Sequence, residues 1–76
     1  MPPVPVLSGR QVVRAFERLG WQVARHRASH IVMVKDGEMA TLSVPDHDEV
    51  ARGTLRGLIR TAGMTVPEFL NAVESV

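Results

Sequence analysis

Residues 30–44 read HIVMVKDGEMATLSV and decide the fold of this chain. Two runs rich in β-branched and apolar residues flank Asp36-Gly37, a dipeptide that is the strongest short signal for a hairpin turn. The pattern predicts strands over 30–35 and 38–44, joined by a two-residue turn. A weaker alternation over 21–27 predicts an earlier strand. We therefore expect three consecutive strands that form one antiparallel sheet.

Helical patterns lie on both sides of these strands. Ser8 begins a capping box, and apolar residues then recur at helical intervals over 9–19. The same periodicity predicts a helix over 51–62, and a second capping box at Thr65 predicts a short third helix. Prolines near the start predict an extended segment over 1–7. The order α-β-β-β-α-α indicates an α+β fold, with helices on one face of a three-stranded antiparallel sheet.

The turn type determines which side chains share a face of the sheet. With a two-residue turn, the numbers of paired residues sum to 73, as 35 and 38 do. One face is then apolar and should pack against the helices; it holds Ile31, Met33, Ala40, Leu42 and Val44. The other face is mixed and should stay open; it holds His30, Val32, Val34, Met39, Thr41 and Ser43. A slip of one residue would bury His30 instead.

Three apolar side chains, Val32, Val34 and Met39, lie on this expected open face. An exposed apolar patch on a small protein is typical of a docking surface. The alternative is that another strand, a helix or a second copy of the chain already covers it. Trp21 is expected in the core, because the chain has few large side chains to fill one.

Composition limits the chain to one small domain over residues 1–76. The sequence has no cysteine, which excludes a disulfide framework and a thiolate metal site and is consistent with the reducing cytoplasm. No apolar run reaches membrane-spanning length, so no membrane partner is expected. The start, MPPVPVL, lacks the charge and length of a signal peptide.

Charge is distributed unevenly along the chain. Residues 1–35 carry six basic and one acidic side chain, for a net charge of +5, whereas residues 36–76 carry three basic and seven acidic ones, for −4. A basic half favours an anionic partner such as RNA, although the two halves could also interleave in space and cancel. The candidate RNA contacts are Arg25, Arg27 and Lys35, together with the helical stripe Arg52, Arg56 and Arg60.

His30 is the candidate for acid–base chemistry. An imidazole takes up and releases protons near neutral pH, and RNA hydrolysis needs both a base and an acid, with cations around the phosphate. A structural role for a lone histidine at a strand end is the alternative. His26 reads as a solvated strand residue, and His47 reads as a loop or cap residue whose backbone is tied to the neighbouring strand. The histidines lack metal-ligand spacing, and no cofactor is expected.

Several short motifs resemble, in order, those of the HicA toxins, also called the YcfA-like family. They are SGRQVV (8–13), LGW (19–21), ASH (28–30), DG (36–37), VPDH (44–47), GTLRGLI (53–59), AGMT (62–65) and EFL (68–70). The family has Gly-Ser-His where this chain has Ala28-Ser29-His30. If that position requires a positive φ, alanine would cost of order 1 kcal/mol.

The resemblance implies a fold similar to double-stranded RNA-binding domains and a metal-independent endoribonuclease that cleaves mRNA. It implies that His30 is the catalytic residue and that the partner is a HicB-type antitoxin. We expect that antitoxin to dock on the patch of Val32, Val34 and Met39. Two alternatives remain: a non-catalytic RNA-binding module of the same fold, and an interaction protein that acts through its apolar sheet face.

Overall fold

Both capping boxes predicted from the sequence form in the structure. The Ser8 hydroxyl accepts a hydrogen bond from the Gln11 backbone N–H at 3.2 Å, and the Gln11 side chain accepts one from the Ser8 N–H at 2.9 Å. The carboxylate of Glu68 likewise accepts from the Thr65 N–H at 2.9 Å, and the Thr65 hydroxyl accepts from the Glu68 N–H. These contacts satisfy amides that have no partner within their helices.

The computed structural model describes residues 4–74. The elements are helix α1 (Gly9–Arg18), strands β1 (Gln22–Arg27), β2 (His30–Val34) and β3 (Leu42–Pro45), and helices α2 (Arg52–Thr61) and α3 (Val66–Glu74). This order confirms the α+β prediction. None of the helices in this described part of the chain is long and apolar enough to cross a membrane.

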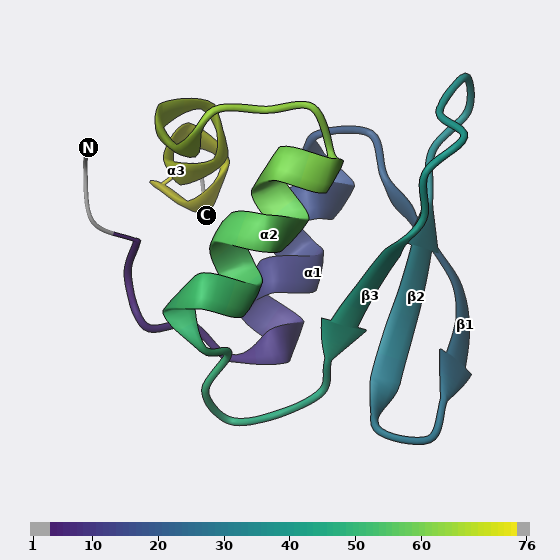
Figure 1. The fold of residues 1–76 in the computed structure, drawn as a ribbon, viewed down its shortest axis with the longest axis horizontal. Coiled ribbons are helices and arrows are strands. Elements are labelled where there is room, and N and C mark those ends of the chain that lie inside the picture. The colour runs from purple at the N-terminus through teal and green to yellow at the C-terminus, as the bar shows by residue number, and fades with distance from the viewer. Residues whose placement is uncertain (1–3, 75–76) are drawn as a thin grey trace.

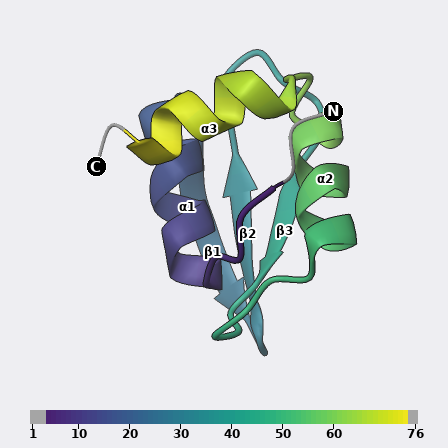
Figure 2. The ribbon, with the colours of Figure 1, turned by 90° about the vertical axis from the view of Figure 1, so that its left-hand side faces the viewer.

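The molecule has two layers. The sheet has the order β1-β2-β3 with antiparallel pairing, and the helices gather on one of its faces (Figure 1). Viewed from the helical side, α1 and α2 lie in front of the strands and α3 crosses at one end (Figure 2). The core between the layers includes Phe16, Trp21, Met33, Leu42 and Phe69. No helix of the described residues 4–74 covers the other face, called the open face below.

The predicted register of β2 and β3 is wrong by two residues. Met33 pairs with Leu42 and His30 with Pro45, so the paired numbers sum to 75. In the turn, Gly37 has a φ of 83° while Asp36 stays negative, which is the φ pattern of a type II turn rather than type I′. A type II turn does not match the twist of paired strands, so the ladder opens before the turn.

The error changes little on the faces of the sheet, because a shift of two preserves the alternation of side chains. Ile31, Met33, Leu42 and Val44 are buried against the helices as predicted. The segment 38–41 is not strand. Consequently Ala40 is half-buried outside the sheet, and Met39 is fully exposed in a β2–β3 connection that projects past the sheet (Figure 1).

The segment before α1 is part of the core. Residues 4–7 are not helical, as predicted, and residues 1–3 lie outside the described part of the chain. Val4 and Leu7 are buried, and the Leu7 carbonyl accepts a hydrogen bond from the Val50 N–H at 2.7 Å. This isolated bridge ties the segment to the loop before α2. The sequence predicted its extended form but not its burial.

Candidate functional site

His30 is exposed at the first position of β2, on the open face. Its Cα partners are Arg27 on β1 and Pro45 on β3, so it lies on the central strand at one end of the sheet. The burial pattern of β2 alternates, with Ile31 and Met33 buried toward the helices. His30 therefore points away from the helical layer, as the sequence predicted.

Pairing across the β1–β2 turn places two arginines on the face of His30. Arg27 pairs with His30 across this two-residue turn, and Arg25 pairs with Val32, so alternation puts both arginines on the open face. A β-bulge then shifts the register between Val23 and Arg25, which leaves Val23 on the same side of β1 as His26. Val23 and His26 both line a groove beside α1.

The turn between β1 and β2 aims His30. Ala28 has a φ of 55°, while Ser29 does not have a positive φ. This is the φ pattern of a type II′ turn, whose first central position favours glycine. The family triplet has glycine at this position, so the structure explains that preference. The Ser29 carbonyl accepts a hydrogen bond from the Asp46 N–H at 2.7 Å, which fixes the turn to the end of β3.

The loop after β3 is held against the start of α1. The Gly9 N–H donates to the His47 carbonyl at 2.9 Å, and Arg10 pairs with Asp46 at 3.5 Å. A Cβ on Gly9 would come within 3.0 Å of the Asp46 Cα and closer still to the Pro45 carbonyl oxygen. The imidazole of His47 is exposed, and the residue holds the loop through its backbone, as predicted, although its partner is α1.

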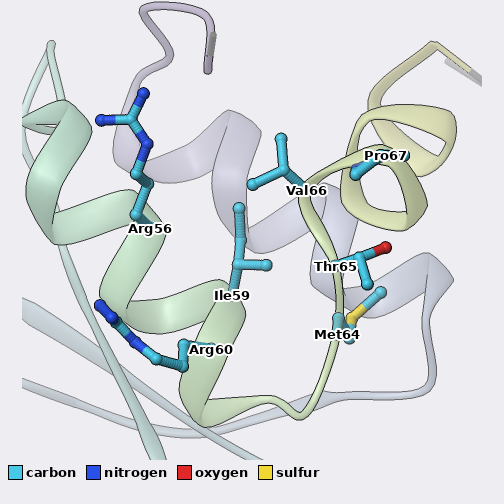
Figure 3. A pocket seen from close by; sticks show the side chains of 7 residues that line it. All are labelled: Arg56, Ile59, Arg60, Met64, Thr65, Val66 and Pro67. Atoms are coloured by element: carbon cyan, nitrogen blue, oxygen red, sulfur yellow. The ribbon is translucent and has the colours of Figure 1, made fainter. Parts of the chain in front are cut away.

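The other candidate cations lie apart from His30. The Lys35 ammonium donates to the Leu19 carbonyl at 3.0 Å, at the C-terminal end of α1, where a cation is favourable. Arg52 donates from Nε to the Val4 carbonyl at 3.1 Å. Arg56 and Arg60 line a pocket in the helical layer (Figure 3). The structure therefore groups Arg25 and Arg27 with His30 and separates the remaining four.

The proposed docking patch is smaller than predicted. Val34 is 37% exposed and Val32 is half-buried on the open face, whereas Met39 lies outside the sheet.

Within residues 4–73 no group of three or more histidine or acidic side chains is arranged to hold a metal ion.

The comparisons with known proteins identify the class of the chain. The sequence model of a family described as "HicA toxin of bacterial toxin-antitoxin" matches residues 9–64. The match covers most of the chain, so the protein is a toxin of a toxin–antitoxin system. It belongs to the HicA toxin family. No curated protein and no solved structure matches, so the similarity to double-stranded RNA-binding domains stays a prediction.

Proposed function

We propose that this toxin is a metal-independent endoribonuclease that cleaves mRNA on the open face of its sheet, with His30 as a general acid–base. The substrate contacts proposed for this reaction are Arg25 and Arg27, both on β1 beside the histidine's end of the sheet. Family membership and the location of His30 support this proposal.

The chemistry requires two proton transfers. The 2′-hydroxyl of the RNA loses a proton as its oxygen attacks the adjacent phosphorus, and the leaving 5′-oxygen gains one as the P–O bond breaks. The imidazole of His30 carries one of these protons. The guanidinium groups of Arg25 and Arg27 would stabilise the negative charge that develops on the phosphate oxygens.

The observation that carries the proposal is the pairing of His30 with Arg27 across the two-residue Ala28-Ser29 turn, with Arg25 two residues earlier on the same face of β1. All three side chains are exposed, so a phosphate backbone can reach them. No acidic side chain forms a salt bridge to either arginine within residues 4–73. Both cations are thus available to an anionic ligand.

Induced expression tests the proposal. Wild-type protein should arrest growth and deplete mRNA, whereas His30→Ala should do neither. The purified wild type should cleave RNA in the presence of EDTA. His26→Ala is the matched control, because His26 is equally exposed on β1 but faces α1. Loss of cleavage in His26→Ala, or retention in His30→Ala, would contradict the assignment.

The same experiment separates the alternatives. A non-catalytic RNA-binding module would arrest growth equally with His30→Ala and leave RNA intact. An interaction protein would bind RNA weakly, and its affinity for its protein partner would not depend on salt. His47→Ala decides whether the imidazole in the loop after β3 supplies the second proton transfer, since cleavage would then fall in both histidine variants.

We further propose that a HicB-type antitoxin covers His30 by docking on the exposed part of Val32 and Val34. The projecting Met39 extends this contact beyond the sheet. Val34→Asp should weaken the complex with the antitoxin, because it places a charge on an apolar contact. An unchanged affinity would place the docking surface elsewhere.

A further inference from the structure

A pocket of about 370 Å³ lies in the helical layer between α2 and the start of α3. Its apolar lining comes from Ile59, Met64, Val66 and Pro67. Arg56 and Arg60, one turn apart on α2, lie on one side of Ile59, with Val66, Met64 and Pro67 on the other (Figure 3). The volume lies within the range of pockets that hold a ligand group.

Within residues 4–73, no acidic side chain forms a salt bridge to either arginine. The salt bridge found there joins Arg10 and Asp46, neither of which lines this pocket. Glu68 lies close in sequence, but its carboxylate accepts hydrogen bonds from the Thr65 N–H and hydroxyl. Two cations thus border an apolar pocket without an intramolecular carboxylate partner. This combination is complementary to a large apolar side chain flanked by acidic residues.

We propose that this pocket binds an acidic segment of the antitoxin that inserts one large apolar side chain between α2 and α3. The inference rests on membership in the toxin family, which implies an antitoxin partner, and is independent of ribonuclease activity. The family model matches the α2 side of the pocket and ends at Met64, so it does not extend over residues 65–67 on the other side. The segment would hold the toxin on the side opposite His30.

The chemistry of the lining favours a protein over RNA. Single-stranded RNA gains affinity by stacking its bases on aromatic rings, and no aromatic side chain lines this pocket. Aliphatic and thioether groups instead accept leucine, methionine or phenylalanine side chains. An antitoxin that contacts both layers would also gain affinity, because the second contact forms within an existing complex.

The test uses the full chain carrying His30→Ala, so that it can be produced without growth arrest. The probe is the capped peptide Asp-Glu-Leu-Phe-Asp-Glu, titrated into ¹⁵N-labelled protein. We expect amide shifts at Ile59, Met64 and Val66. The paired change Arg56→Glu and Arg60→Glu should weaken binding by about tenfold or more. Arg18→Glu is a single-charge control, because it reverses one exposed charge on α1, and it should leave the affinity within about twofold.

A second titration replaces the peptide with the purified antitoxin, and the same paired change should weaken that complex. A peptide affinity that the paired arginine change leaves unaltered would overturn the proposal. An unaltered antitoxin affinity would also overturn it, because the occupant of the pocket would then be another protein. Cleavage by wild-type protein is measured separately, so a failure of the ribonuclease assignment leaves these results readable.

Two other occupants have distinct signatures. If a decauridylate probe shifts the pocket amides and the paired arginine change abolishes this, the surface binds RNA and the proposal is wrong. The connection carrying Asp36, Glu38 and Met39 has the chemistry expected of the occupant, so a second copy of the chain is the other rival. Concentration-dependent association that Met39→Ser abolishes would identify that copy and overturn the proposal.

Discussion

Ala28 adopts a backbone conformation that is costly for a residue with a Cβ. Its φ of 55° lies in the left-handed region, and the turn it forms aims His30. The hydrogen bond from Asp46 to the Ser29 carbonyl holds this turn in place, so the neighbouring structure offsets the strain. The resemblance to the family identified this position, and the structure gives the physical reason for the family's glycine.

Ala28→Gly should therefore stabilise the protein by about 0.5–1 kcal/mol, because the relief of strain exceeds the added entropy of the unfolded chain. Chemical denaturation measures the free energy of unfolding. Ala24→Gly in β1, where φ is negative, is the control and should destabilise. An equal decrease in the free energy of unfolding in both variants would show that Ala28 is unstrained.

Gly9 is a second residue with a specific steric role. The start of α1 approaches the end of β3 so closely that a Cβ would collide with the Pro45 carbonyl. Gly9→Ala should destabilise by about 1–3 kcal/mol, as other overpacked sites do, and should reduce cleavage by moving the loop next to His30. In Gly53→Ala the new methyl group meets nothing within 4 Å. That control should gain about 0.5–1 kcal/mol from helix propensity.

At the scale of elements, β1 shows what sequence reasoning can and cannot predict. The existence of three strands and the buried face of β2 followed from composition and alternation. The bulge between Val23 and Arg25 did not, because β1 is exposed at every position and has no apolar period to reveal an inserted residue. The pairing of Arg27 with His30, in contrast, follows from the strands predicted over 21–27 and 30–35, which leave Ala28-Ser29 as a two-residue turn. The roles of these side chains stay a prediction.

The predicted register at the β2–β3 turn was wrong for a different reason. Asp36-Gly37 does form the turn, and Glu38 donates to the Lys35 carbonyl at 3.0 Å. The sequence does not say which residues take a positive φ, and that choice decides whether the strands pair up to the turn. Likewise, the spacing of Arg52, Arg56 and Arg60 predicted one stripe, but the packing of the N-terminal segment on α2 divided it.

The start of α3 has a pH-dependent contribution to stability. Hydrogen bonds from the Thr65 backbone and hydroxyl lower the pKa of Glu68. The charged carboxylate therefore stabilises the fold above its ordinary value of 4.5, and this contribution disappears as the pH falls through the lowered value. Glu68→Gln keeps a hydrogen-bond acceptor but removes the charge.

Thermal unfolding of the two proteins between pH 7 and pH 2 tests this. Wild type should be more stable than Glu68→Gln at pH 7, and the two melting temperatures should converge at the acid end of the range. A constant difference at every pH would mean that the ionised carboxylate is not involved.

At the scale of the whole molecule, the N-terminal segment closes the core. Val4 and Leu7 lie between elements that are distant in sequence, and Arg52 and Val50 both bond to the segment's backbone. A domain of this size buries little surface, so each such side chain is a large share of its stability. The extended segment thus acts as a structural part of the helical layer.

Leu7→Ala should cost about 2–3 kcal/mol, near the lower end for a buried leucine, since the site lies at the edge of the core. Val6 lies beside it but is 51% exposed, so Val6→Ala should change the free energy of unfolding by less than about 0.5 kcal/mol. If both variants behave alike in chemical denaturation, the segment does not pack as described.

The two layers should also separate two kinds of binding. RNA is expected on the open face and a protein segment in the helical layer, because cations lie beside an exposed histidine on one and beside an apolar pocket on the other. The change Arg25→Gln with Arg27→Gln removes two cations that are available to phosphate. The slope of log affinity against log salt for single-stranded RNA should then flatten by about 1.4.

The matched pair Arg56→Gln and Arg60→Gln removes the same charge from the other layer. It should leave the RNA affinity and salt slope unchanged while weakening the acidic peptide. The two pairs lie in different layers and share no partner in the described structure. Their effects on binding free energy should therefore be additive in the variant that carries all four substitutions. Equal loss of RNA affinity from both pairs would instead show that RNA follows the charge of the whole molecule, and the division of function between the layers would be wrong.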